Sequence, residues 1–263
     1  MIGRYSLKAE TIQQLIDWEP PKVREIIGDG ILWPGTKGLI YGQFGTWKSM
    51  IAMHTGYCLT TGRNWFGHQV NRCPTLMLQM EIPKMLFRER HKKYLLGNKL
   101  LAPPDLWTVT DHSLTLDRGF GIQGVESLLA ALRPQVLIID PIYKIMQGNI
   151  NENDQVKPVL DLFDRWISTY HLSVLLIGHP RKPSKEELNH EIDFQGYELM
   201  GASFWANWFD TMARVTPVPG SKNHILMEFN KVRNAQIEIP SVLVTIDRNT
   251  LTFTHKTAET REE

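Results

Sequence analysis

The sequence predicts an α/β protein with a mainly parallel central sheet flanked by helices, followed by a C-terminal β-meander. Between residues 38 and 178, short β-rich runs alternate with segments that carry apolar residues at helical spacing. This is the pattern of a parallel sheet with helices packed on its faces. Two of the runs, 136–139 and 174–177, are apolar. Continuous apolar runs of this length are typical of central strands buried on both sides.

The expected elements follow one another as far as residue 254. The strand candidates in the first part are Gly38–Tyr41, Thr75–Met80, Leu106–Thr110, Val136–Asp140 and Ser173–Gly178. The expected helices lie between them, at roughly 48–62, 83–97, 121–132 and 154–170. The later runs are Thr211–Val215, Ile225–Asn230, Val242–Ile246 and Leu251–Thr254. Short turns separate these later runs, so we expect a meander that extends the same sheet.

The two ends of the chain differ from this pattern. Residues 1–30 are mixed in character and interrupted by Pro20 and Pro21, so we expect an N-terminal arm rather than a domain. Residues 31–255 form the expected single domain, and we expect the charged tail 256–263 to be frayed. With 263 residues, 42% of them hydrophobic, the chain is long enough to bury a sizeable core.

Charge and cysteine content limit the function classes. The formal net charge of +1 gives no global sign of a nucleic-acid binder, so any basic surface must be local. Cys58 and Cys73 match neither a disulfide framework nor a zinc spacing, which suits a reducing cytoplasm. The N-terminus lacks the layout of a signal peptide, and no apolar run approaches the ~20 residues that cross a bilayer. We therefore expect a cytoplasmic protein without membrane contact.

A turn with two glycines joins the first expected strand to the first expected helix. Its residues are Gly42, Gln43, Phe44, Gly45, Thr46, Trp47, Lys48 and Ser49. In this strand–turn–helix context the pattern indicates a loop that holds nucleotide phosphates, because backbone N–H groups at a helix N-terminus attract anions. Lys48 would reach the β- and γ-phosphates of ATP, and the Ser49 hydroxyl would ligate Mg²⁺. The alternative is a surface turn whose glycines and lysine are incidental.

One residue departs from the pattern G-x-x-x-x-G-K-[ST]. Trp47 stands where glycine is usual. Because a positive φ is costly for tryptophan, we expect the loop to hold Trp47 in a helical or extended conformation. Its ring would flank the nucleotide or a neighbouring subunit.

Two later strands end in carboxylates. Asp140 follows an apolar strand, the arrangement that holds the hydration shell of Mg²⁺ at the carboxyl edge of a sheet. Glu81 follows another strand and is a candidate for polarising the attacking water. The alternatives are a strand-end cap for Asp140 and a helix N-cap before Pro83 for Glu81.

Polar residues at two further strand ends complete the candidate set. His179 follows a buried strand, where it would contact the γ-phosphate and report its loss to the next loop; the alternative is a turn histidine. Lys231 and Arg233 lie two residues apart at the end of a later strand. They are either solvated edge charges or a pair that reaches the γ-phosphate of the next subunit, the arginine-finger role.

The remaining histidines and aromatic residues predict no further chemistry. The histidines His54, His68, His91 and His112 stand at no metal-ligand spacing, so the only metal ligands expected are Ser49 and Asp140. A cluster of aromatic residues recurs at helical spacing, comprising Phe204, Trp205, Trp208 and Phe209. This spacing favours a core or subunit interface over a base-stacking platform.

In this order, the motifs resemble the RecA-like ATPases of the RepA/DnaB type, the ring-forming replicative helicases. The small single-domain RepA-like branch of plasmids, phages and mobile elements is especially similar. The resemblance covers roughly residues 30–235. Its matching parts are Gly42–Ser49, Thr61-Gly62 with Trp65-Phe66-Gly67, Glu81, Asp140-Pro141, His179 with Lys182, Gly201-Ala202-Ser203 with Asp210, and Lys231-x-Arg233.

The resemblance implies a RecA-like P-loop core and a role for each matching residue. Glu81 would be the catalytic base, His179 the γ-phosphate sensor, and Lys231 with Arg233 the pair that acts in trans. It also implies a homo-oligomeric ring, usually a hexamer, with single-stranded DNA in its channel. The loops 143–156 and 181–200 would face that channel, although neither has a surplus of positive charge.

The expected function is therefore an oligomeric, DNA-dependent ATPase, a replicative DNA helicase of a phage or mobile element that uses ATP and Mg²⁺. Two alternatives stay open. One is a RecA/RadA-like recombination mediator or strand-annealing ATPase that does not unwind DNA. The other is a regulatory nucleotide-binding module with weak hydrolysis, which Trp47 keeps open.

Overall fold

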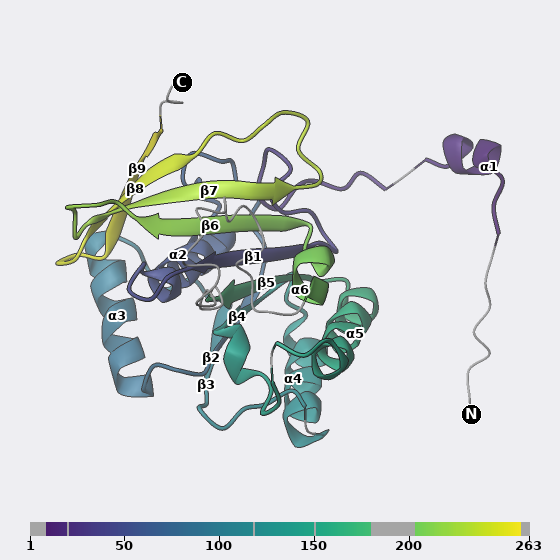
Figure 1. Ribbon diagram of the computed structural model, residues 1–263, viewed down its shortest axis with the longest axis horizontal. Helices are drawn as coiled ribbons and strands as arrows, with labels where there is room; N and C mark the ends of the chain where they lie inside the picture. The colour runs from purple at the N-terminus through teal and green to yellow at the C-terminus, as the bar shows by residue number, and fades with distance from the viewer. Residues whose placement is uncertain (1–8, 20, 118, 150, 180–202, 259–263) are drawn as a thin grey trace, which may run out of the picture.

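The computed structural model describes residues 9–19, 21–117, 119–149, 151–179 and 203–258. A single mixed sheet forms the centre of the fold, and its nine described strands follow the order β3-β2-β4-β5-β1-β6-β7-β8-β9 (Figure 1). The strands of the first, parallel part are β1 (Lys37–Gly42), β2 (Thr75–Gln79), β3 (Leu106–Thr110), β4 (Val136–Asp140), β5 (Ser173–Gly178) and β6 (Thr211–Pro217). These strands confirm the predicted parallel sheet.

The sheet changes character after β6. The strands β7 (His224–Val232), β8 (Val242–Asp247) and β9 (Thr252–Thr257) pair antiparallel with one another, and β7 pairs antiparallel with β6. This part is the predicted meander, and it continues the central sheet as expected. The strands β4 and β5 are buried along their whole length, which agrees with their continuous apolar sequence.

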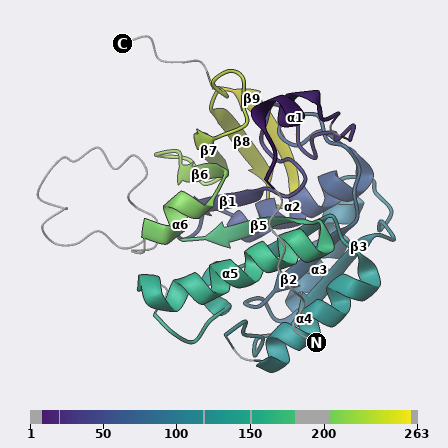
Figure 2. The ribbon, with the colours of Figure 1, turned by 90° about the vertical axis from the view of Figure 1, so that its right-hand side faces the viewer.

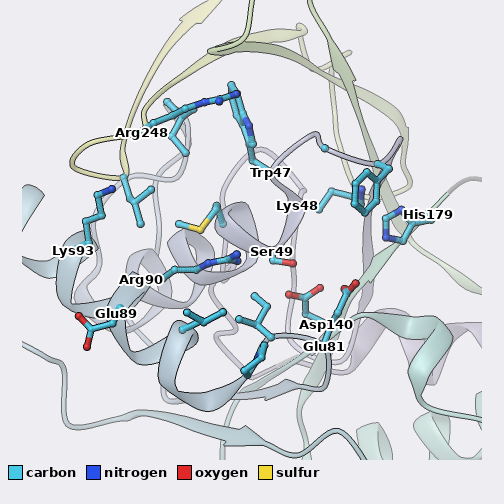
Figure 3. Close-up of a pocket in the computed structure, with 18 residues that line it drawn as sticks. Trp47, Lys48, Ser49, Glu81, Glu89, Arg90, Lys93, Asp140, His179 and Arg248 are labelled. Atoms are coloured by element: carbon cyan, nitrogen blue, oxygen red, sulfur yellow. The ribbon is translucent and has the colours of Figure 1, made fainter.

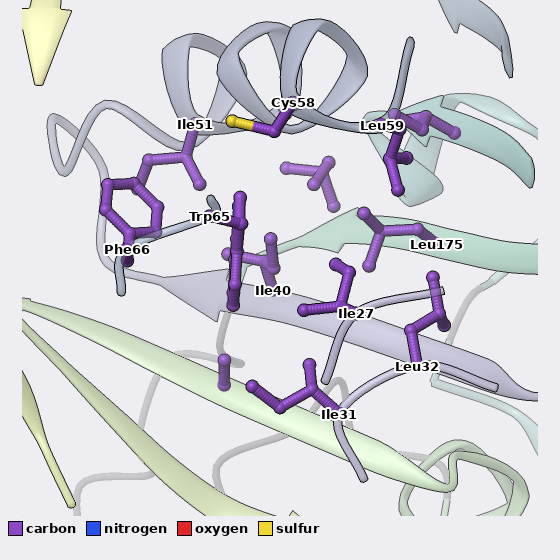
Figure 4. Packing of buried hydrophobic residues seen from close by; sticks show 14 of the residues in the cluster. Ile27, Ile31, Leu32, Ile40, Ile51, Cys58, Leu59, Trp65, Phe66 and Leu175 are labelled. Atoms are coloured by element: carbon purple, nitrogen blue, oxygen red, sulfur yellow. The ribbon is translucent and has the colours of Figure 1, made fainter. Parts of the chain in front are cut away.

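Helices cover the two faces of the parallel part (Figures 1 and 2). Their bounds are α2 (Lys48–Thr61), α3 (Lys84–Gly97), α4 (Gly119–Leu132), the short 3₁₀ helix η1 (Ile142–Lys144), α5 (Asn153–Tyr170) and α6 (Ser203–Trp208). Buried side chains of α4, α5 and α6 share one hydrophobic cluster with the sheet. Those of α2 share a second cluster with the other face of the sheet and with β7 and β8 (Figure 4).

The expected aromatic cluster is part of the core. Trp205 and Phe209 are fully buried and Trp208 is nearly so, whereas Phe204 is partly exposed. Trp208 packs against Phe163 of α5, and its indole N–H donates to Asp164 Oδ1 at 3.0 Å. The short helix α6, which carries three of these residues, therefore holds the beginning of β6 against α5.

The N-terminal segment is an arm for only part of the predicted range. Helix α1 (Ile12–Asp17) has no buried residue, and its apolar side chains Ile12 and Ile16 are about 70% exposed. By contrast, Ile26 and Ile27 are buried in the second cluster, and Ile27 forms bridges to Leu32 and Val70. The predicted boundary at residue 30 is thus too late, because apolar residues before it belong to the core.

Within the described ranges, none of the helices has the length and apolar character needed to cross a membrane. The predicted channel loop 181–200, Lys182 and the Gly201-Ala202 pair lie outside the described residues.

Candidate nucleotide-binding site

The loop between β1 and α2 makes a tight turn beside β6. A Cβ atom on Gly42 would lie 2.1 Å from the Val215 carbonyl oxygen, so only glycine fits there. Gly45 has a φ of +84°, a left-handed conformation that favours glycine. The Thr46 hydroxyl donates to the Gln43 carbonyl oxygen at 2.8 Å, and this bond closes the turn. The loop therefore has the narrow path that a phosphate-binding loop requires.

Trp47 lies in the left-handed region, with φ 56° and ψ 24°, directly before α2. The prediction of a helical or extended conformation was wrong, because the loop keeps the backbone conformation of the usual glycine. That conformation costs an L-residue about 1–2 kcal/mol. The half-buried indole offsets this cost by packing on the cluster that contains Met50, Met53 and Ile246. The Trp47 carbonyl accepts from the N–H groups of Met50 and Ile51, at 2.8 and 2.9 Å, and so begins α2.

The side chain of Lys48 is folded into the loop. Its ammonium group donates to the Gln43 carbonyl oxygen at 2.7 Å and to Thr46 Oγ1 at 3.4 Å. Burial lowers the pKa of Lys48 to about 8, against the opposing effect of Asp140 and Glu81. The acceptors of the ammonium group are thus neutral oxygens. Phosphate oxygens can take their place, because a charged acceptor forms a stronger hydrogen bond.

Asp140 ends β4 and is 1% exposed. Its Oδ2 accepts from Gln79 Nε2 at 3.0 Å, whereas Oδ1 is buried and has no hydrogen-bond partner among the described residues. Burial raises the pKa of Asp140 to about 6, and the neighbouring Ser49 hydroxyl opposes this shift. A buried carboxylate oxygen without a partner, next to a hydroxyl, suits the oxygen coordination of Mg²⁺. The residues therefore fit the predicted cation.

Gln79 is a functional candidate that no sequence motif marks. Its amide oxygen accepts from the backbone N–H groups of Glu81 and Ile82, at 2.6 and 2.7 Å, while its Nε2 holds Asp140. The buried Gln79 amide therefore fixes the position of Glu81 relative to Asp140, which ends the neighbouring strand β4. The available signal was a lone amide in the otherwise apolar end of the run Thr75–Met80, since buried polar side chains need a specific partner.

His179 follows β5 and lies between two aromatic rings. Phe44 of the loop stacks on it, with ring centroids 6.4 Å apart, and Tyr143 of η1 lies 5.9 Å away. Burial, together with the nearby Lys48 charge, lowers the pKa of His179. The neutral imidazole is therefore favoured, and it can donate or accept a hydrogen bond at a phosphate oxygen.

Most of the side chains described above line one cavity of about 860 Å³, although Gln79 does not (Figure 3). Of the sequence candidates it contains Phe44, Gly45, Trp47, Lys48, Ser49, Glu81, Asp140 and His179. The order of the strands explains why residues far apart in the sequence meet here, because β2, β4, β5 and β1 are neighbours and their carboxyl ends share one edge of the sheet.

Lys231 and Arg233 do not belong to this cavity. They lie at the end of β7, where it pairs with the beginning of β6, beside the amino end of β1. The six residues of β1 separate this place from the phosphate loop, roughly 16–20 Å at about 3.3 Å per residue. Lys231 Nζ donates to the Ala206 carbonyl at 2.9 Å, and Arg233 contacts Asp210 and the Asn207 carbonyl. A role on the chain's own phosphates is therefore excluded by position. Because β7 pairs with β8 only from His224 to Met227 and Arg233 is about half exposed, this place fits both solvated edge charges and a pair that acts on the next subunit.

A RecA-like sheet with a phosphate loop at its carboxyl edge defines a P-loop ATPase. A family model described as an AAA domain matches residues 4–185, and the chain belongs to this family. The match includes the phosphate loop, Glu81, Asp140 and His179, whereas β6–β9 lie beyond it. None of the curated proteins matches the chain.

Solved structures show the same fold. The chain is similar to the flagellar accessory protein FlaH from Methanocaldococcus jannaschii, with 14% sequence identity and a TM-score of 0.58. The similarity covers 86% of this chain and 91% of the FlaH chain. The similarity therefore covers a larger share of the chain than the family match over residues 4–185 does.

Proposed function

We propose that the chain hydrolyses ATP at the cavity between β1, β2, β4 and β5. The proposal rests on one observation: Lys48, Ser49, Glu81, Asp140 and His179 line the same cavity. Mg²⁺ bound with the nucleotide supplies positive charge at the β- and γ-phosphate oxygens. Ser49 and Asp140 are the residues that would hold it, directly or through its water shell.

The other side chains have separate tasks in this proposal. The Lys48 ammonium group exchanges the Gln43 carbonyl for phosphate oxygens as its acceptor. Glu81 orients the attacking water and accepts its proton, and Gln79 keeps the Glu81 backbone in place. His179 hydrogen-bonds the γ-phosphate as a neutral imidazole. When the γ-phosphate is lost, His179 transmits the change to the neighbouring loops through its contacts with Tyr143 and Phe44.

Lys231 and Arg233 support a homo-oligomer in this proposal. They are remote from the chain's own cavity, yet they are cations at a surface edge, and Arg233 is about half exposed. A ring of six subunits, as in the RepA/DnaB-type helicases that the motifs resemble, would bring them to the nucleotide of the next subunit. There they would stabilise the charge that develops on the transferred phosphoryl group.

We further propose that hydrolysis drives movement along single-stranded DNA, as in a replicative helicase of a phage or mobile element. This part depends on the resemblance of the ordered motifs. Of the two expected channel loops, the described part of 143–156 offers Tyr143 and Lys144 at its beginning, next to the nucleotide cavity.

One experiment separates these proposals. The mass in solution is measured with a non-hydrolysable ATP analogue and with or without single-stranded DNA, alongside ATP turnover under the same conditions. We expect a nucleotide-dependent oligomer and DNA-stimulated turnover. Displacement of a strand from a forked duplex then identifies a helicase, whereas binding without displacement identifies a recombination mediator. A monomer in all conditions would remove the mechanism in trans.

A regulatory nucleotide-binding module is the second candidate. It is favoured by Trp47 in the glycine position and by the bonds that hold Lys231 and Arg233 within their own chain. A protein with the same fold is described as a flagellar accessory protein. Turnover decides between the candidates: equal, very slow hydrolysis by the wild type and by Glu81→Gln supports the module, while a large difference supports the ATPase.

A further inference from the structure

The nucleotide cavity extends beyond the residues that handle phosphate. Its second half lies between α2, α3 and the turn that joins β8 to β9 (Figure 3). The residues lining this half include Trp47, Met50, Glu89, Arg90, Lys93, Ile246, Arg248 and Leu251. Met50 and Ile246 are buried apolar side chains, so this half has an apolar floor and a rim of cations.

Trp47 and Arg248 face each other across this half. The guanidinium carbon of Arg248 lies 5.8 Å from the centroid of the Trp47 ring. Both groups have flat faces that stack on aromatic rings. Each is also held: the Trp47 backbone begins α2, while Arg248 Nη2 donates to the Lys222 carbonyl at 2.6 Å.

The turn that carries Arg248 has a defined shape. Asp247 Oδ1 accepts from the Asn249 N–H at 2.7 Å, and the Asp247 carbonyl accepts from the Leu251 N–H at 2.7 Å. Leu251 takes a positive φ of 55° to complete the turn. Arg248 is therefore presented toward the phosphate loop by an ordered turn rather than by a loose loop.

We infer that Trp47 and Arg248 form a platform for the nucleobase, with the base stacked between the indole ring and the guanidinium group. This inference rests on the proposed nucleotide binding. Trp47 directly precedes Lys48, so one nucleotide can place its base on the Trp47 ring while its phosphates occupy the loop. Two stacking contacts need roughly 7 Å, twice the usual ~3.5 Å separation, so the β8–β9 turn moves slightly outward when the base enters.

The polar side chains beside the platform do not distinguish one base from another, because every base carries acceptors that a donor can meet. Arg90, Lys93 and Arg248 are hydrogen-bond donors only. The one acid lining this part of the cavity, Glu89, is paired with Arg88 and Lys92. Stacking then sets the preference, and a purine, having the larger ring system, binds more tightly than a pyrimidine.

The test compares Mg-ATP with Mg-tripolyphosphate, which has the phosphates but no base. Affinities are measured by calorimetry for the wild type, Trp47→Gly, Trp47→Phe and Arg248→Ala, with Arg24→Ala as a control for loss of an exposed arginine. We expect Trp47→Gly to lose about tenfold or more in ATP affinity, the usual effect of removing one stacking partner. Tripolyphosphate affinity should stay within about threefold, because glycine suits the left-handed backbone.

The other variants sharpen the result. Trp47→Phe keeps an aromatic face and should retain most of the preference for ATP over tripolyphosphate. Arg248→Ala should lower ATP affinity alone, and it leaves the phosphate loop intact if Trp47→Gly does not fold. The preference of the wild type for ATP over CTP should shrink in Trp47→Gly.

Equal losses for ATP and tripolyphosphate, or no loss in either variant, would overturn the platform, because Trp47 would then act only on loop shape. A wild type that binds neither compound would instead remove the proposed nucleotide site itself, and the platform with it.

Discussion

Arg233 donates from Nη1 to Oδ1 of Asp210 at 3.2 Å within the same chain. Asp210 Oδ2 also accepts from the backbone N–H of Lys37 at 3.0 Å, so a single carboxylate ties the end of β7 to the beginning of β1. The guanidinium group is thereby fixed at the edge of the sheet opposite the phosphate loop. A residue held there can act on a nucleotide only if that nucleotide belongs to another subunit.

This arrangement predicts complementation between two inactive variants. Glu81→Gln and Arg233→Ala should each lose hydrolysis by about 10²–10³-fold or more, because one lacks the base and the other the cation in trans. Mixing them should restore measurable turnover. In the mixture, a subunit with intact Glu81 can meet a neighbour with intact Arg233. Turnover is measured as a function of the mixing ratio.

Arg165→Ala is the matched control, because Arg165 is also an exposed arginine with an ion pair in its own chain. It should retain wild-type turnover. Full activity of Arg233→Ala on its own, or no recovery on mixing, would contradict the mechanism in trans.

Gln79→Leu should affect both stability and catalysis. The substitution leaves Asp140 Oδ2 and the N–H groups of Glu81 and Ile82 without their partner, at a cost of roughly 2–4 kcal/mol in the free energy of unfolding. Turnover should fall further than ATP affinity, since the Glu81 segment loses its position. Urea unfolding and steady-state kinetics measure the two effects. Gln135→Leu makes the same change on the surface and should have little effect; equal behaviour of both variants would argue against the network.

The two glycines of the phosphate loop should respond differently to alanine. At Gly42 the new Cβ would meet the Val215 carbonyl at 2.1 Å, so we expect a loss of roughly 2–4 kcal/mol or a failure to fold. At Gly45 no described atom lies within 4 Å of the new Cβ. The cost there is the left-handed conformation alone, about 1–2 kcal/mol. Thermal unfolding of the two variants gives the order, and a more stable Gly42→Ala would contradict the close approach of β6.

Acid should destabilise the protein through His54. Burial lowers the pKa of His54 from 6.5 to about 3, so the folded state holds this ring neutral while the unfolded state protonates it below about pH 6.5. The resulting stability is present above pH 6.5 and is lost as the pH falls toward 3. Between pH 7.5 and pH 5 the loss is about 2 kcal/mol.

In urea unfolding at the two pH values, His54→Gln should reduce the loss of stability by about 2 kcal/mol, while His91, whose pKa burial lowers to about 4, keeps a similar contribution of its own. His112→Gln, at an exposed position, should unfold with the wild-type dependence on pH. An unchanged slope in His54→Gln would assign the effect to other groups.

Much of the fold could be predicted because it depends on local patterns. The continuous apolar runs of β4 and β5 and the turns of the C-terminal part specify strands, a parallel sheet and its extension. The boundary of the N-terminal arm could not be predicted, since the burial of Ile26 and Ile27 depends on β-bridges to residues later in the chain. Trp47 shows the reverse case, where packing of the ring overrides the backbone preference of the residue.

The site divides in the same way. Lys48 stands at the beginning of a helix, and Glu81, Asp140 and His179 follow strand ends, so sequence patterns mark all four, and they line one cavity. The role of Gln79 could not be predicted, because its contact with Asp140 depends on the register between β2 and β4. Arg248 reaches the cavity only through the path of the β8–β9 turn, and no sequence motif marks it.

The change from parallel to antiparallel pairing at β6 divides the chain into two parts whose residues have different functional roles. The part that matches the family model, residues 4–185, contains every side chain placed at the phosphates of the chain's own nucleotide. Lys231, Arg233 and Arg248 all come from the strands beyond it. Hairpins can be lengthened or exchanged without changing the connections of the parallel sheet. The specificity for the base and for the neighbouring subunit can therefore change while the residues at the phosphates stay the same.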